Sequence, residues 1–115
     1  MSNDREIEAA IVAAGADKAP RISVDMIEQS ILSEHYMRAS EFPDLVRWPT
    51  SVTALSCLTI CVLVLKNGYT VVGKSACASP ENFNAEIGGR IAREDAVRQI
   101  WALEGYRLRC ELAAK

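Results

Sequence analysis

The sequence predicts an α+β fold in which a small antiparallel β-hairpin packs against flanking α-helices. A strand–turn–strand pattern surrounds Asn67-Gly68, and apolar residues recur at helical spacing before and after it. The 115 residues, 50% hydrophobic and 24% charged, suffice for one domain with a modest core. No linker or internal repeat divides the chain. We therefore expect a single domain, 1–115, with N-terminal helices in 1–37, the hairpin in 53–77 and C-terminal helices in 79–113.

Two helices are predicted before the hairpin. Residues 3–15 carry isoleucines and alanines at helical spacing, and Gly15 suits the end of that helix. Residues 24–36 follow Ser23, a good N-cap residue, so we expect a second helix there.

The loop predicted over residues 38–52 contains two bulky aromatic residues, Phe42 and Trp48. One interpretation is that both fold back over the core. The alternative is that they form a rim that stacks on a planar ligand.

The hairpin is predicted from Asn67-Gly68, because a two-residue type I′ turn needs positive φ at both positions. That turn would pair Val64 with Val71. The second face is also apolar, so we expect the N-terminal helices or a second copy to cover it. The predicted core face carries Leu58, Ile60, Val62, Val64 and Val71, and the second face carries Cys61, Leu63, Leu65, Thr70, Val72 and Lys74.

The C-terminal helix is expected to begin at Ser79-Pro80, an N-cap followed by proline, and to bend near Glu104-Gly105. Each glycine inside a helix costs about 1 kcal/mol relative to alanine. A stripe of small residues therefore predicts close approach to another backbone, that of the hairpin. The stripe is Ala85, Gly88, Gly89, Ala92, Ala96, Ile100 and Leu103.

Composition argues against several classes of protein. The formal net charge of −2 argues against a general nucleic-acid binder. The apolar run "LTICVLVL" is too short to span a bilayer, and the acidic N-terminus does not resemble a signal peptide, so we expect a cytoplasmic protein without a membrane partner.

Motifs for catalysis or metal binding are weak. The four cysteines form no C-x-x-C pair and the only histidine is His35, so neither a metal nor a cofactor is expected. The segment "GYTVVGKS" formally matches a phosphate-binding loop, but it lies in a hairpin arm rather than between a strand and a helix. We therefore expect no catalytic residue and no enzyme activity.

The best ligand candidates are cationic and aromatic. Arg90, Arg93 and Arg98 lie on one predicted helix, and with Lys74 on the hairpin they could form a cationic pocket. A solvated basic face is the alternative for each of them. Tyr69 and Phe83 are candidate stacking partners, and Asn84 completes the predicted ligand-binding set.

Residues 58–108 resemble a small family encoded by tailed phages and prophages, known as the phage gene 49/gene 66 family. The motifs that carry the resemblance are "NGYTVVGKSAC", "PENFNAEIG", "IARED" and "IWALEGY". Ala102 departs from the proline that the family often has after the tryptophan, which puts the bend in doubt. The resemblance implies a phage accessory protein with no assigned catalytic residue, akin to anti-Thoeris signal sponges.

Two functional hypotheses follow. The first is a homo-oligomeric counter-defence protein of the host bacterial cytoplasm that sequesters a nucleotide-derived immune signal, a cyclic ADP-ribose isomer or a cyclic oligonucleotide, without catalysis. The alternative is a protein that inhibits or adapts a host protein by direct contact, as anti-CRISPR proteins do. An enzyme ranks third.

Overall fold

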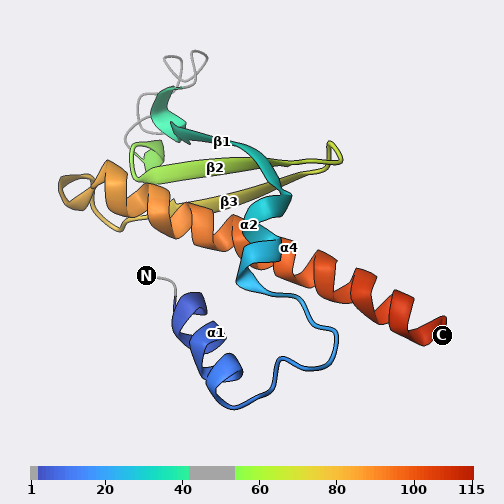
Figure 1. Ribbon diagram of the computed structural model, residues 1–115. Coiled ribbons are helices and arrows are strands. Elements are labelled where there is room, and N and C mark those ends of the chain that lie inside the picture. The colour runs from blue at the N-terminus through green and yellow to red at the C-terminus, as the bar shows by residue number, and fades with distance from the viewer. Residues whose placement is uncertain (1–2, 42–53) are drawn as a thin grey trace.

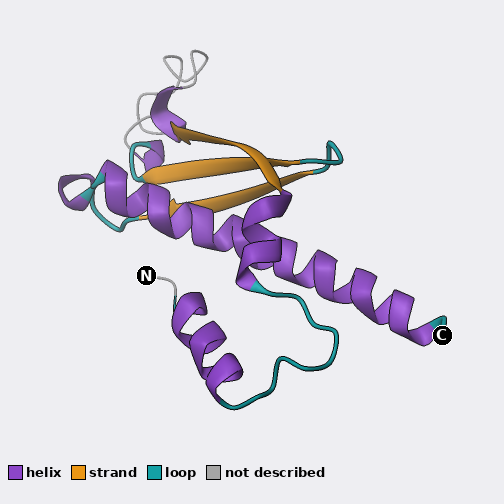
Figure 2. Ribbon diagram, viewed as in Figure 1, coloured by secondary structure: helices purple, strands orange, loops and turns teal. Residues whose placement is uncertain are grey.

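The computed structural model describes residues 3–41 and 54–115 (Figure 1). They form the predicted α+β fold: a three-stranded antiparallel sheet in the order β1-β2-β3, with helices packed on it (Figure 2). Phe42 and Trp48 lie outside the described residues. The elements are α1 (Asp4–Ala13), α2 (Val24–Ser30), β1 (Ile31–Arg38), the 3₁₀ turn η1 (Ala39–Glu41), β2 (Leu58–Leu65), β3 (Thr70–Ala76), the 3₁₀ turn η3 (Pro80–Asn82) and α4 (Ala85–Ala113).

The strand β1 corrects the predicted helix over residues 24–36. The hydroxyl of Ser23 accepts a hydrogen bond from the Met26 N–H at 3.2 Å, as expected of an N-cap. The helix then ends, because Ile31 has extended backbone angles. From there the chain pairs with the central strand, so that Glu34 lies opposite Leu63. Pairing with a strand distant in sequence overrides a helical pattern that is only local.

The hairpin turn also differs from the prediction. The Gly68 N–H donates to Leu65 O at 2.9 Å, the Leu65 N–H donates to Tyr69 O at 2.8 Å, and the only positive φ in the turn is that of Gly68, +89°. This is a three-residue loop, a type I turn followed by a left-handed glycine, rather than a type I′ turn. Leu63 therefore pairs with Val71.

A shift of one residue exchanges the two faces of a strand. On β2, the face predicted to be the second one is therefore the core face that packs under α4, whereas Val71 on β3 faces the core as predicted. The buried members of this face are Cys61, Leu63, Leu65 and Val71.

The predicted close approach of the small-residue helix to the hairpin is confirmed. A Cβ atom added to Gly73 would lie 2.0 Å from Ala92 O and 2.4 Å from Ala96 N. Ala92 and Ala96 are fully buried. The backbones of β3 and α4 thus touch directly, and only glycine fits at that point of the strand.

The helix α4 begins later than predicted and is continuous. It begins at Ala85, where the Asn84 Oδ1 accepts the Ile87 N–H at 3.0 Å, while Ser79-Pro80 opens only the short turn η3. It continues without a break for 29 residues, so the predicted bend near Glu104-Gly105 is absent. Its C-terminal part projects beyond the sheet (Figure 1). The radius of gyration is consequently 17.6 Å, whereas a compact chain of this length has about 13 Å.

The other face of the sheet remains open among the described residues. Val72 is 51% exposed there, and its neighbours on β2 are only half-buried. The N-terminal helices do not cover this face, because α2 packs on α4 and α1 packs on α2. Their cover was predicted for the face of Cys61 and Leu63, where α2 does contribute the buried Ile27 beside α4. The open face is formed by Met37, Leu58, Ile60, Val62, Val64 and Val72.

Candidate functional site

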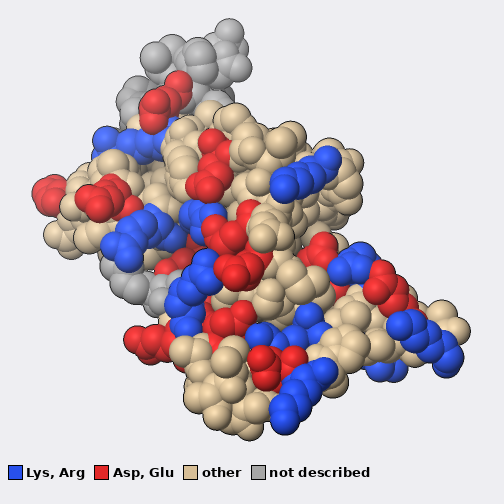
Figure 3. Space-filling view, in the orientation of Figure 1, with Lys and Arg blue, Asp and Glu red and all other residues tan. Residues whose placement is uncertain are grey.

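A hollow lined by charged side chains lies where α1, α2 and α4 meet. We call it the junction hollow; its volume is about 530 Å³. Figure 3 shows blue and red side chains intermingled over this region. Three arginines and three carboxylates line it, so its formal charge is balanced: Arg5, Arg93 and Arg98 against Asp4, Glu28 and Glu94.

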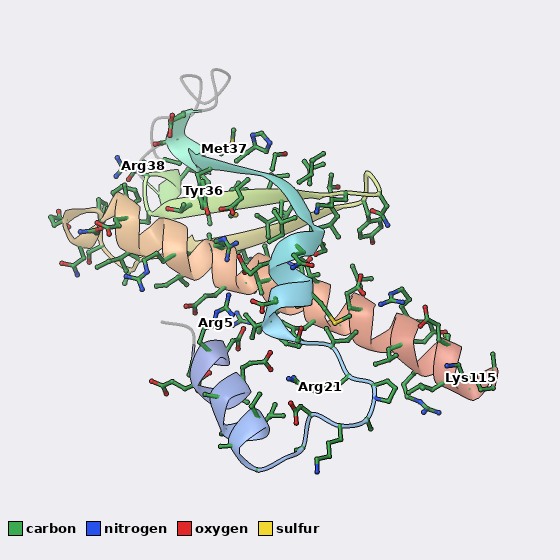
Figure 4. All side chains as sticks on the ribbon, viewed as in Figure 1. Arg5, Arg21, Tyr36, Met37, Arg38 and Lys115 are labelled. Carbon is green, nitrogen blue, oxygen red and sulfur yellow. The ribbon has the colours of Figure 1, made fainter. Side chains whose placement is uncertain are left out.

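Polar contacts rather than apolar packing attach α1 to the rest of the molecule. Arg5, at the end of α1 nearest α2 and α4 (Figure 4), pairs with Asp25 at 2.9 Å. Asp4 accepts the Trp101 indole N–H at 3.3 Å. No residue of α1 is buried. The wall of the hollow that α1 forms is therefore the wall that is held least firmly.

Glu8 provides the third attachment of α1. Its carboxylate pairs with Arg21 at 2.5 Å and accepts the Val24 N–H at 3.1 Å. The hydrogen bond from Arg21 is the main reason why the pKa of Glu8 lies below its ordinary value.

Arg93 is fixed at the floor of the junction hollow by two carboxylates. Its Nη2 lies 2.8 Å from Glu28 Oε1, and its Nε lies 3.1 Å from Glu34 Oε1. The Tyr36 hydroxyl donates to the same Glu34 oxygen at 2.7 Å. The hydrogen bond from Arg93 holds the pKa of Glu34 below its ordinary value, and Glu28 and then Glu34 raise the pKa of Arg93. Arg93 is therefore positioned firmly, but its charge is largely neutralised within the chain.

A second, mainly apolar hollow of about 280 Å³ adjoins the first. Isoleucines of α1 and the half-buried ring of Trp101 line it, and it shares Asp4, Val24 and Arg98 with the junction hollow. Charged and apolar surfaces thus meet at one place, which is the usual character of a small-molecule site.

The structure does not bring the predicted ligand set together. Of the residues 69, 74, 83, 84, 90 and 93, only Arg93 lines the junction hollow. Tyr69 follows the hairpin turn and is 55% exposed. Phe83 lies at the other end of β3, about 23 Å away for a strand of seven residues. Tyr69 and Phe83 therefore cannot stack on one ligand within a single chain. The ring of Phe83 also has a partner already, because the guanidinium of Arg38 lies 3.7 Å from its centroid.

The other predicted residues have structural positions of their own. Asn84 caps α4. Lys74 is exposed on β3, and its backbone N–H donates to Asp95 at 2.9 Å. Arg90 is exposed on α4 and does not line the junction hollow. The predicted cationic pocket is therefore not formed by one chain, although a ligand role for each side chain stays a prediction.

Arg98 is the second arginine that the sequence pointed to and that lines the hollow. Arg5 and Trp101 were missed, and the available signal was modest: Trp101 follows Phe83, Ile87 and Ile91 on a second apolar stripe of the helix. Arg5 gave no signal, because its role depends on how α1 is placed.

The segment matching a phosphate-binding loop has the surroundings that the sequence predicted. It lies in the hairpin turn and β3, and no helix opens directly after it. In the part of the chain that the structure describes, no cluster of three or more His, Cys, Asp or Glu side chains could hold a metal ion. Nor does any helix in that part have the length and apolar character needed to cross a membrane.

Comparison with known proteins gives one match. Neither curated proteins nor solved structures gave a match to this chain. A family model matches residues 22–112, so the similarity begins well before Leu58, where the sequence motifs began, and includes β1. Because the match covers most of the 115 residues, the chain belongs to the phage protein (N4 Gp49/phage Sf6 gene 66) family.

Proposed function

We propose that this phage protein captures a nucleotide-derived immune signal, a cyclic ADP-ribose isomer or a cyclic oligonucleotide, and holds it without converting it. The observation that carries the proposal is the adjacency of the junction hollow and the apolar hollow beside Trp101. A nucleotide has the matching parts: anionic phosphates, ribose hydroxyls that donate hydrogen bonds, and a flat base.

The phosphates bind to the two arginines that are easily redirected. Arg5 and Arg98 are 65% and 70% exposed, and each pairs with an aspartate, Asp25 and Asp95. Exposed ion pairs of this kind contribute about 0–1 kcal/mol, so a phosphate can replace the aspartate at little cost. A guanidinium also binds phosphate oxygens through two parallel hydrogen bonds.

The sugar and the base occupy the other walls. The Glu28 carboxylate, which Arg93 holds in place, accepts hydrogen bonds from ribose hydroxyls. The base lies against Trp101 and the isoleucines of α1 in the apolar hollow. Base stacking on an aromatic ring contributes about 1–3 kcal/mol.

The test is calorimetric titration of the protein with a panel of cyclic ADP-ribose isomers and cyclic oligonucleotides. Arg98→Glu should abolish binding, while Arg109→Glu, an exposed arginine on the same helix but outside both hollows, should bind as the wild type does. In a Trp48→Phe background, Trp101 emission should change on binding. The bound compound should be recovered with unchanged mass, whereas a changed mass would indicate an enzyme. Absence of binding across the panel would refute the proposal.

The open face of the sheet supports a second candidate function, direct binding of a host protein. Met37 and Val72, which are 39% and 51% exposed, flank the half-buried apolar side chains of β2. Apolar patches of this kind mark protein contacts. Val62→Lys, in the middle of the open face, should abolish capture of a host protein from lysate and leave nucleotide binding unchanged. The opposite pattern would support signal capture alone.

A further inference from the structure

The two edges of the sheet differ in how their hydrogen-bonding groups are used. At the β3 edge, side chains of α4 occupy the outward-facing backbone groups. Gln99 Nε2 donates to Val72 O at 2.6 Å, and the Lys74 N–H donates to Asp95 Oδ2 at 2.9 Å. Such capping prevents another strand from pairing at that edge.

The β1 edge is not capped in this way over its middle. The Arg38 N–H donates to Glu41 Oε1 at 2.8 Å, which shows that it points away from β2. Alternate residues of a strand share that direction, so Glu34 and Tyr36 also direct their backbone N–H and C=O groups outward. Within residues 3–41 and 54–115, no partner is found for these four groups.

The outer side of β1 is also accessible. The helix α4 packs mainly on β3 and β2, and it reaches β1 through the ion pair of Arg93 with Glu34 and at Gly89, which lies beside the Tyr36 ring. Tyr36 on the α4 side and Met37 on the open face, both labelled in Figure 4, are 49% and 39% exposed. Figure 1 shows no described element along the outer side of β1. A strand added on that side would therefore lie where Figure 1 shows no described element.

We infer that a second copy of this chain pairs its β1 antiparallel with β1, so that the two three-stranded sheets become one continuous sheet. The register follows from the free groups. Glu34 of one copy and Tyr36 of the other exchange both of their backbone hydrogen bonds, twice by symmetry, and His35 faces His35 across the two-fold axis. The ladder ends at these two pairs, because the next one, Leu32 with Arg38, would need the Arg38 N–H group that Glu41 already holds.

A second copy fits this edge better than an unrelated strand because the pairing is self-complementary, as a two-fold interface requires. On the α4 side it places Glu34 opposite Tyr36, which is already its hydrogen-bond partner within the chain, and opposes no like charges. On the other side it joins the two open apolar faces into one. This inference does not depend on the proposed ligand.

The first test is a cysteine cross-link in a Cys110→Ser background, which removes the exposed native thiol. Directly opposed residues that are not hydrogen-bonded to each other have Cα atoms about 4.5 Å apart, within disulfide range. Under glutathione disulfide, which accepts the two electrons of the two thiols, His35→Cys should give a dimer on a non-reducing gel. The matched control is Val72→Cys on the capped β3 edge, which should stay monomeric. Equal cross-linking of both variants, or of neither, would overturn the inference.

The second test measures size by sedimentation. The wild type should sediment at twice 12.6 kDa. Tyr36→Pro removes one outward N–H and should yield a monomer with an unchanged circular dichroism spectrum, while Tyr36→Ala keeps the N–H and should remain a dimer. A monomeric wild type, or a dimer in Tyr36→Pro, would overturn the inference even if the cysteine variants fail to fold.

Discussion

The two sides of α4 are packed in opposite ways. Against the sheet, Ala92 and Ala96 touch the backbone at Gly73, and the residues around them are fully buried. Against α1, the same helix borders two hollows, and no residue of α1 is buried. The comparison shows how a small protein can combine a fixed scaffold with a site that has room for a ligand. The predictions below test that division, and they run from the largest expected effect to the smallest.

Gly73→Ala should have the largest effect. The added Cβ would lie 2.0 Å from a backbone oxygen of α4 that no side-chain movement can relieve. We expect a loss of about 3 kcal/mol or more in the free energy of unfolding, measured by urea denaturation. A loss below about 1 kcal/mol would show that the sheet and α4 are not in direct backbone contact.

Leu63→Ala and Ile7→Ala compare the two sides directly. Leu63 is fully buried between the sheet and α4, while Ile7 on α1 is 50% exposed. Removing the leucine side chain should cost about 2–5 kcal/mol, and removing the isoleucine side chain about 1 kcal/mol or less. The same denaturation measurement applies to both, and equal losses would contradict the division of α4 into a packed side and a loose side.

Glu34→Gln should change the pH dependence of stability. The pKa of Glu34 in the folded chain lies below its ordinary value of 4.5, because Arg93 and Tyr36 donate hydrogen bonds to it. Its stabilising contribution is therefore complete above the ordinary pKa and is lost as the pH falls through the lowered one. The variant should lose about 1 kcal/mol at neutral pH and show a flatter fall in stability below about pH 4.5.

Two further variants serve as controls for that profile. Arg93→Met removes the main cause of the lowered pKa and should flatten the acid limb as Glu34→Gln does, whereas Tyr36→Phe should flatten it less. Unfolding curves recorded between pH 3 and 7 would decide. An unchanged acid limb in Arg93→Met would mean that this ion pair does not contribute.

Gly105→Ala should have the smallest effect, and its sign should be opposite. An added Cβ meets nothing within 4 Å, so the substitution only removes the cost of a glycine in the interior of α4. We expect a gain of up to about 1 kcal/mol in the free energy of unfolding. A loss would indicate that another surface, such as a second chain, approaches the helix closely at this point.

The sequence predicted those features that depend on neighbouring residues. Three predictions rested on local physical reasons, and the structure confirms them. Ser23 caps α2, Gly68 has a positive φ in the hairpin turn, and the small-residue stripe of α4 packs closely on the hairpin. The errors arose where partners distant in sequence decide. Residues 31–38 form a strand because β2 is available for pairing, and one extra residue in the turn exchanged the two faces of β2 relative to β3.

The candidate site could be predicted only in part, for the same reason. Arg93 and Arg98 were recognisable as cations on one helix, but the ion pair of Arg93 with Glu28 joins α2 to α4 across a long stretch of sequence. The role of Arg5 depends on the placement of α1, which long-range polar contacts such as that between Asp4 and Trp101 determine.

The amino-acid sequence by itself determined the fold class, the family and the close fit of a small-residue helix on a hairpin, because these follow from periodicity, capping and side-chain volume. Only the tertiary structure decided the register of the sheet, the identity of its buried face and the hollow beside α1. These features depend on which residues distant in sequence pair with each other. Each such pair contributes only about 1 kcal/mol, and the residues next to it in sequence do not indicate its partner.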